Sequence, residues 1–307
     1  MTRYLLPYAP DRIGGLPEEV DAAVWDGVAP PPPQEVLDGV EFFCLPYMTG
    51  GAALPLLRRL PALRVVQTLT AGVDDVLPHL PVGVTCCNAH GLHDASTAEL
   101  AATLILASLR GIPQAVRRQD AEDWQQKFHP SLADRTVLIV GYGSIGAALE
   151  QRLLPFECDV VRVARSARPA PHGPVHALDE LPALLPAADV VVLLVPLTEQ
   201  SRGLAGKDFL GRMKDGALLV NVARGAVVDT GALLGELESG RLRAALDVTD
   251  PEPLPAGHPL WHAPNVLITP HIGGPSSAFL PRALRLLRSQ LLLDLAGEPL
   301  SHVVAVG

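Results

Sequence analysis

The chain has 307 residues, which is enough for two domains of ordinary size, each with its own hydrophobic core. Apolar residues make up 48% of the chain, as in folded globular proteins, and the formal net charge of -9 argues against a surface that binds nucleic acid. We therefore expect a globular protein with no nucleic-acid partner.

No C-x-x-C pair occurs among the four cysteines, which are Cys44, Cys86, Cys87 and Cys158. Neighbours such as Cys86 and Cys87 point to opposite faces of a strand, so we expect buried free thiols in a reducing compartment. The first residues lack the pattern of a secretory signal. The longest apolar runs, at 100–109 and 190–197, are shorter than the ~20 residues that cross a bilayer. These features predict a cytoplasmic protein with no membrane partner.

Short apolar segments alternate with helical patterns in the first 90 residues. Strands are predicted at 4–6, 40–44, 64–68 and 84–87, and helices at 17–26, 51–59 and 73–77. Such alternation is typical of β-α-β units and predicts a parallel sheet. The proline run at 30–33 is expected to be a stiff surface connection.

A long helix is predicted at 95–110. Asp94 or Ser96 can cap its start, and the sequence Gly-Ile-Pro at 111–113 is expected to end it. The helix is apolar on nearly all sides, so it should be buried, between domains or between subunits. A polar segment with Trp124 and Phe128 follows.

The stretch Thr136 to Gly146, TVLIVGYGSIG, joins an apolar strand to three glycines spaced G-x-G-x-x-G. Gly141 permits a tight turn, Gly143 lets the backbone approach a pyrophosphate, and Gly146 lets the next helix pack closely. The N–H groups at the start of that helix, expected at 147–154, would face the anion. The pattern predicts a dinucleotide-binding unit.

A regular second series of strands is predicted at 160–164, 190–195, 217–222, 243–248 and 266–269. With the strand at 137–140 they make six, the number in a dinucleotide-binding fold of two halves. One helix is expected at 230–239, before Gly240, and an amphipathic helix at 276–296 is expected to return to the first domain.

The chain resembles the D-isomer-specific 2-hydroxyacid dehydrogenase family over most of its length beyond residue 64. The matching stretches are QTLTAGVDDV at 67–76, NAHGLHDASTAEL at 88–100, the glycine motif, LVPLTEQSRGL at 194–204, MKDGALLVNVARG at 213–225, AALDVTDPEPLP at 244–255, HPLW at 258–261 and NVLITPHIGG at 265–274. The resemblance implies two Rossmann-like or flavodoxin-like α/β domains with parallel sheets and an active-site cleft between them. We place the substrate-binding domain at 1–96 plus 276–307 and the dinucleotide-binding Rossmann domain at 97–275.

The same resemblance implies an oxidoreductase that transfers a hydride between a nicotinamide dinucleotide and a 2-oxo or D-2-hydroxy acid. Arg224 resembles the family arginine that holds the substrate carboxylate, for which its planar fork suits it better than lysine. His271 resembles the family acid/base, and Glu252 the carboxylate that hydrogen-bonds the histidine. A carboxylate there stabilises imidazolium and raises the histidine pKa.

Further site residues are implied in the same way. Ala71, Gly72 and Val73, at the start of a predicted helix, resemble the loop whose N–H groups hold the substrate carboxylate, and Asp247 resembles the residue that binds the nicotinamide carboxamide. Pro196 and Val222 are expected to pack along the cofactor, and Ser144 and Ile145 to bind it within the glycine motif. His90, His93 and Asp94 form only a weak metal-binding pattern, and we expect no metal.

An NAD-binding fold of this type expects Asp or Glu at the end of its second strand, where it accepts hydrogen bonds from the ribose. That position here reads Ala164-Arg165-Ser166, and Asp159 lies at the wrong end of the strand. Arg165 and Ser166 offer a cation and a hydroxyl to a 2′-phosphate. The sequence favours NADP as the cofactor, with NAD possible if the arginine is merely solvated.

The leading hypothesis is an NADPH-dependent reductase of glyoxylate-like or hydroxypyruvate-like 2-oxo acids. Alternatives are phosphoglycerate or phosphite dehydrogenase activity, or a non-enzymatic dinucleotide-sensing protein of the same fold. A formate dehydrogenase is disfavoured because those enzymes have glutamine where Glu252 stands. The family suggests a homodimer built around residues 98–128.

Overall fold

The computed structural model describes residues 3–14, 16–17, 20–49 and 51–307. Its chain divides into two compact units, one made of residues 1–93 and 277–307 and the other of residues 94–276. These boundaries differ by three residues and by one residue from those expected at 96/97 and 275/276. Both units are α/β structures built on largely parallel sheets, as predicted.

The first unit contains a six-stranded sheet in the order β14-β5-β4-β3-β1-β2. Only β14 among these runs antiparallel to its neighbour. The strands are β1 (Tyr4–Leu6), β2 (Ala22–Val24), β3 (Phe42–Cys44), β4 (Val65–Gln67), β5 (Thr85–Cys87) and β14 (Val303–Val306). The helices are α1 (Pro10–Ile13), α2 (Gln34–Leu37), the 3₁₀ turns η1 (Leu54–Arg59) and η2 (Leu77–His79), and α9 (Phe279–Ala296).

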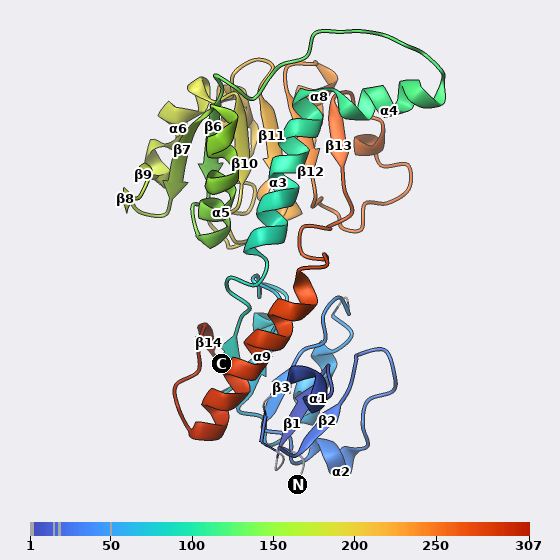
Figure 1. Cartoon of the computed structure of the whole chain (residues 1–307), viewed down its shortest axis with the longest axis vertical. Coiled ribbons are helices and arrows are strands. Elements are labelled where there is room, and N and C mark those ends of the chain that lie inside the picture. The colour runs from blue at the N-terminus through green and yellow to red at the C-terminus, as the bar shows by residue number, and fades with distance from the viewer. Residues whose placement is uncertain (1–2, 15, 18–19, 50) are drawn as a thin grey trace. The chain divides into compact units, whose positions relative to one another are not determined.

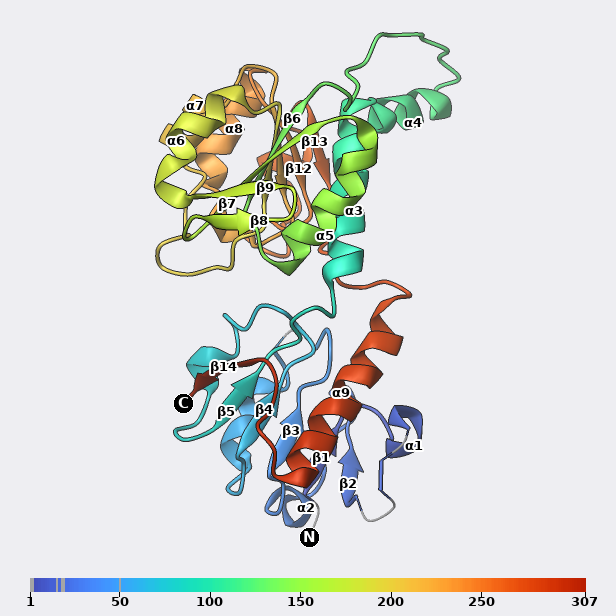
Figure 2. The same cartoon turned by 60° about the vertical axis from the view of Figure 1, so that its left-hand side comes forward.

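Alternating side chains of this sheet enter two hydrophobic clusters. Tyr4, Phe42 and Val65 face Leu287 and the rest of the apolar stripe of α9, which lies along the sheet in Figure 2. Their sequence neighbours pack on the other face, against η1. The last long helix therefore covers the first unit, as expected.

Three elements of this unit differ from their predictions. The helix expected at 17–26 is wrong: residues 18 and 19 lie outside the described part, and Ala22–Val24 pairs with β1 as an edge strand. The helices expected at 51–59 and 73–77 are short 3₁₀ turns, each with a proline in its first turn. Proline lacks an N–H donor and clashes with the preceding turn, so neither segment continues as an α-helix.

The second unit contains an eight-stranded sheet in the order β13-β12-β11-β10-β6-β7-β9-β8. Its strands are β6 (Thr136–Val140), β7 (Asp159–Ala164), β8 (Arg168–Ala170), β9 (Gly173–Ala177), β10 (Val190–Leu193), β11 (Leu218–Asn221), β12 (Arg243–Leu246) and β13 (Val266–Ile268). All six predicted strands are present. The antiparallel pair β8 and β9, which was not predicted, extends one edge.

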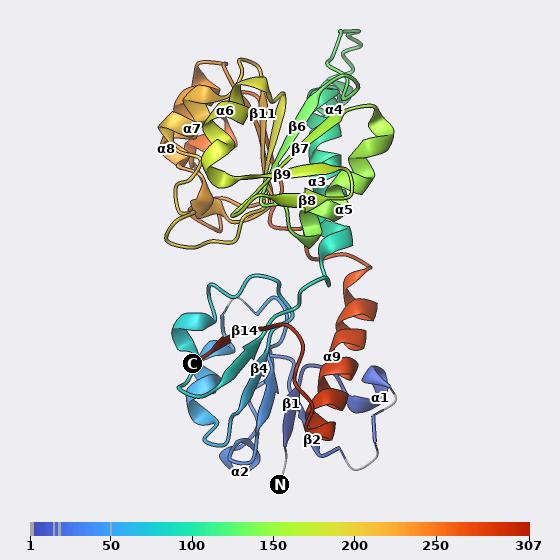
Figure 3. The same cartoon turned by 90° about the vertical axis from the view of Figure 1, so that its left-hand side faces the viewer.

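Helices cover both faces of this sheet, as Figures 1 and 3 show. The bounds are α3 (Asp94–Leu109), α4 (Ile112–Asp120), α5 (Ser144–Leu153), η3 (Leu154–Phe156), η4 (Leu178–Glu180), α6 (Leu181–Leu184), η5 (Leu185–Ala187), α7 (Lys207–Arg212), η6 (Gly225–Val227), α8 (Thr230–Glu238) and η7 (Pro259–Trp261). Val137 and Ile139 of β6 pack with α3 and α5, and Leu138 and Val140 pack with α6, α7 and α8.

Strand β6 lies between β7 and β10, so the chain order reverses beside it. In parallel sheets of this kind, ligands bind at the carboxyl ends of the strands next to such a reversal. The four cysteines are free, and all but Cys158 are buried. Among the described residues, no single helix is long and apolar enough to cross a membrane.

Candidate active site

Arg224 is presented at the carboxyl end of β11 by a local turn. The Asn221 side chain accepts a hydrogen bond from the Ala223 N–H (3.0 Å) and donates one to the Arg224 carbonyl oxygen (2.9 Å). These two bonds turn the chain away from the sheet just before Arg224. The Arg224 guanidinium, which is partly buried, donates to the Ala223 carbonyl oxygen at 2.9 Å.

Gly225 brings this turn against the loop that follows β12. A β-carbon at this position would lie 1.9 Å from the carbonyl oxygen of Thr249, which is far inside the contact distance of real side chains. The close approach therefore requires glycine here. It places the backbone next to Arg224 in contact with the loop that leads to Glu252.

Asp247 is the buried residue that organises the loop after β13. Its carboxylate accepts hydrogen bonds from the Thr269 hydroxyl (2.6 Å) and from the N–H groups of Ile272 (2.9 Å) and Gly273 (2.8 Å). Its own carbonyl oxygen accepts from the His271 N–H at 2.8 Å. Asp247 thus fixes the backbone on both sides of His271, a positioning role that sequence reasoning missed because both partners lie on a different strand end.

His271 and Glu252 form a hydrogen-bonded pair, with 2.5 Å between Nδ1 and Oε1. The bond from Glu252 raises the pKa of His271 above that of an ordinary histidine, although partial burial acts against it. For Glu252, burial raises the pKa, but the bond from His271 and the nearby positive charges outweigh it and leave the pKa below the usual value. The pair therefore favours a charged imidazolium beside a carboxylate.

Arg224 lies close enough to this pair for its charge to act on both members. The guanidinium charge lowers the pKa of His271 and that of Glu252. The second unit thus gathers one cation, one proton donor and one carboxylate at the carboxyl ends of β11, β12 and β13. Such a set can bind a carboxylate and transfer a proton to a neighbouring carbonyl oxygen.

A cavity of about 760 Å³ opens beside the glycine motif, at the carboxyl ends of β6, β7 and β10. Gly141 has φ +103°, and a β-carbon there would lie 2.5 Å from the Leu194 carbonyl carbon, so only glycine lets the turn lie this close to the end of β10. Helix α5 then begins at Ser144 with its N-terminus next to the cavity. This lining fits a dinucleotide pyrophosphate.

Five of the predicted cofactor residues line this cavity: Gly141, Gly143, Arg165, Ser166 and Pro196. Sequence reasoning did not select Arg168, which also lines it and whose guanidinium donates to the carbonyl oxygen of Tyr142 within the glycine motif. A second arginine three residues after Arg165 was the available signal. No carboxylate occurs among the described residues of the lining.

The remaining predicted cofactor residues lie elsewhere in the second unit. Ser144 donates to the Asp94 carboxylate at 3.0 Å, and Ile145 follows it in the first turn of α5. Gly146 approaches the Gly141 carbonyl oxygen closely, as expected for tight packing of the helix. Val222 is buried in the cluster beneath α3 rather than in the cavity.

The loop Ala71–Val73 belongs to the first unit. The Asn88 side chain donates to the Ala71 carbonyl oxygen (2.8 Å), and the Thr70 hydroxyl donates to the Gly72 carbonyl oxygen (2.7 Å). These bonds fix the loop through its carbonyl groups. No helix begins at Val73, so the predicted support from a helix N-terminus is wrong. Among the described residues, no group of three His, Cys, Asp or Glu side chains could hold a metal ion.

Comparison with known proteins gives consistent matches. The family model for "D-isomer specific 2-hydroxyacid dehydrogenase, NAD binding domain" matches residues 102–273. A human glyoxylate reductase/hydroxypyruvate reductase is 34% identical over 253 residues, which is 78% of this chain and 76% of that protein.

Two solved structures share the whole fold. An NADPH-dependent glyoxylate/hydroxypyruvate reductase from Sinorhizobium meliloti, solved with NADP and sulfate, is 26% identical, with a TM-score of 0.84 and coverage of 99% of this chain and 98% of that one. A family member from Xanthobacter autotrophicus, solved with NADPH and MES, is 29% identical, with a TM-score of 0.81 and the same coverage. The chain therefore belongs to the D-isomer-specific 2-hydroxyacid dehydrogenases, oxidoreductases that act on the CH–OH group of their donors.

Proposed function

We propose that this enzyme is an NADPH-dependent reductase that converts small 2-oxo acids of the glyoxylate and hydroxypyruvate type to D-2-hydroxy acids. The observation that carries the reductase assignment is the His271–Glu252 hydrogen bond beside Arg224, because it combines a charged proton donor with a cation for the substrate carboxylate. Glyoxylate and hydroxypyruvate are named for similar proteins from human and Sinorhizobium.

In the proposed reaction, Arg224 pairs with the substrate carboxylate and orients the adjacent carbonyl group. A reduced nicotinamide dinucleotide, when bound, supplies the hydride that adds to the carbonyl carbon. His271 gives the proton on Nε2 to the carbonyl oxygen, so that the 2-oxo acid gains a hydride and a proton and becomes the 2-hydroxy acid. Glu252 holds the imidazolium in place through Nδ1 and is not itself consumed.

The preference for NADPH is supported by the lining of the cavity next to the glycine motif. Arg165, Ser166 and Arg168 lie where an NAD-binding fold carries an acidic residue. Guanidinium groups favour a 2′-phosphate, and the lack of a carboxylate among the described lining residues removes the usual repulsion against one. Asp247 and the N–H groups of Ala71, Gly72 and Val73 are proposed to bind the nicotinamide carboxamide and the substrate carboxylate, respectively.

We also propose a homodimer built around residues 98–128 and a location in the cytoplasm. Trp124 and Phe128 are almost fully exposed, at 96% and 108%, and an extended segment that carries two bare aromatic rings is suited to a protein contact. Replacing both rings with serine should convert a dimer to a monomer in sedimentation experiments. The free thiols of Cys44, Cys86 and Cys87 suit a reducing compartment.

Steady-state kinetics test the function directly. NADPH and NADH are compared with glyoxylate, hydroxypyruvate, pyruvate and bulkier 2-oxo acids. We expect the highest kcat/KM with NADPH and one of the first two acids. Tight NADPH binding without turnover on any acid would instead favour a dinucleotide-sensing protein.

A further inference from the structure

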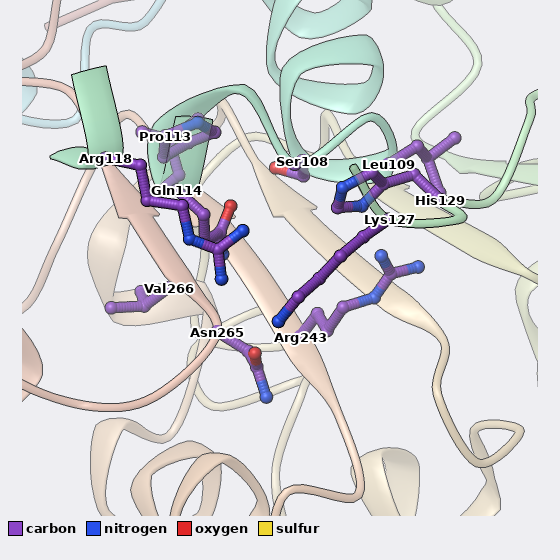
Figure 4. A pocket seen from close by; sticks show the side chains of 12 residues that line it. Ser108, Leu109, Pro113, Gln114, Arg118, Lys127, His129, Arg243, Asn265 and Val266 are labelled. Atoms are coloured by element: carbon purple, nitrogen blue, oxygen red, sulfur yellow. The ribbon is translucent and has the colours of Figure 1, made fainter. Parts of the chain in front are cut away.

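A second cavity, of about 280 Å³, lies at the opposite edge of the larger sheet from the residues described above. Its lining comes from the end of α3, the start of α4, the segment between α4 and β6, and the first residues of β12 and β13 (Figure 4). Arg243 opens β12, whereas Asp247 follows the end of the same strand. The cavity is therefore separate from the proposed catalytic residues of this unit.

The lining of this cavity is strongly basic. Arg118, Lys127 and Arg243 line it together with His129, and no carboxylate belongs to the described lining residues. In Figure 4 the amino group of Lys127 and the guanidinium of Arg118 point into the cavity. This concentration of positive charge occurs in a chain whose net charge is -9. An anion would relieve the repulsion among these groups.

The hydrogen-bonding groups of the cavity point to the same need. Burial, together with the charge of Arg135, lowers the pKa of Arg243, as expected for a cation short of negative partners. The hydroxyl oxygen of Ser108 is buried and has no hydrogen-bond partner among the described residues. The side chains of Gln114 and Asn265 add amide donors, and the first turn of α4 adds the positive end of its dipole.

The arrangement of the cations selects the class of anion. Arg118 lies on α4, Lys127 on the following segment and Arg243 on β12, so they approach from three directions rather than as one planar fork. A tetrahedral oxyanion with several charged oxygens matches that better than a flat carboxylate. The volume equals that of about nine liquid water molecules, which leaves room for a small organic group. We infer that this cavity is a binding site for a phosphate group, either free or in a phosphate monoester.

Bound phosphate would join the segment after α4 to the body of the unit. The His129 ring already lies over Gly111, where a β-carbon would come within 2.3 Å of it. Phosphate between Lys127 and Arg243 would add an ionic link between this segment and β12. Trp124 and Phe128 are exposed on the same segment, so its order can be followed by chymotrypsin cleavage at these residues.

The test is calorimetric titration of inorganic phosphate and of glycerol 3-phosphate into the wild-type enzyme, with NADPH at saturation to fill the other cavity and chloride to fix the ionic strength. Arg118→Gln and Lys127→Gln are each expected to weaken binding about three- to tenfold. The matched control is Arg117→Gln, because Arg117 is the exposed neighbour on α4 and does not line the cavity. Phosphate should also slow chymotrypsin cleavage in the wild type but not in Lys127→Gln.

The two sources of phosphate are told apart by affinity: tighter binding of glycerol 3-phosphate identifies a monoester, and equal affinities identify free phosphate. The inference is overturned if neither ligand gives saturable heat, or if Arg117→Gln weakens binding as much as the cavity variants. Tighter binding of citrate than of phosphate would also overturn it. So would variants that change the oligomeric state but not phosphate binding, since the cavity would then be a protein contact.

Discussion

The Nδ1 atom of His271 lies 2.5 Å from the Oε1 atom of Glu252, although the two residues are 19 positions apart in the chain. They meet because β12 and β13 are adjacent parallel strands whose following loops emerge at the same edge of the sheet. Asp247, at the end of β12, completes the arrangement by accepting hydrogen bonds from both sides of His271. One strand end therefore holds both the histidine loop and the loop of its carboxylate partner.

Replacing Glu252 with glutamine should shift the pH dependence of reduction to lower pH. The carboxylate is the main reason for the raised pKa of His271, and without it burial and the Arg224 charge lower that pKa. Reduction needs the protonated ring, so the rate should decline at a lower pH than in the wild type, and kcat near neutral pH should fall at least about tenfold. The measurement is kcat/KM against pH, with the exposed Glu238→Gln as control. An unchanged profile would separate Glu252 from the proton donor.

Replacing Arg224 with lysine should show whether the planar fork matters. The charge is kept, but bidentate pairing with a carboxylate is lost, so kcat/KM for the 2-oxo acid should fall by about 10- to 100-fold. Binding of NADPH, followed by fluorescence, should be unaffected. A variant with wild-type kinetics would mean that Arg224 does not hold the substrate carboxylate.

Replacing Arg165 with aspartate should move the cofactor preference toward NADH. The change removes a cation from the cavity lining and adds an acceptor for ribose hydroxyls. We expect the ratio of kcat/KM for NADPH to that for NADH to drop by about 10- to 100-fold. Arg202→Asp, on an exposed position outside the lining, is the control for the change in net charge. A constant ratio would argue against 2′-phosphate binding at Arg165.

Replacing Gly225 with alanine should destabilise the second unit. The new β-carbon would collide with the Thr249 carbonyl oxygen, and relieving such an overlap costs about 1–3 kcal/mol or more. Gly235→Ala is a matched control, because that glycine lies within α8 with open space around it and should gain up to about 1 kcal/mol. Thermal unfolding compares them; equal Tm values would show that the two loops do not need this contact.

The sequence predicted the elements with strong local signals and missed those that depend on distant partners. Strand β6, the turn at Gly141 and α5 follow from an unbroken apolar run and the glycine spacing. Helix α4 was missed because Pro113 was interpreted as the end of α3. Gly111 ends α3 in a left-handed conformation, and the proline instead starts a second helix, where its missing N–H costs nothing.

Short edge strands were the other omission. Strand β2 has only three residues and β8 contains Pro169, so neither carries a periodic signal, and both exist because a longer neighbour offers hydrogen bonds. For the candidate site, family motifs pointed to Arg224, Glu252 and His271. The buried bonds of Asp247 and the place of Arg168 depend on strand order, which local sequence does not encode.

The most direct test of the proposed mechanism is NADPH oxidation by the His271→Ala variant with hydroxypyruvate, measured alongside the affinity for NADPH. His271 lies outside the lining of the glycine-motif cavity, so NADPH binding should stay within about twofold of the wild type. Loss of the proton donor should reduce kcat by about 10²- to 10⁴-fold. Turnover within a few fold of the wild type, with NADPH still bound, would contradict the assignment of His271 as the acid that completes the reduction.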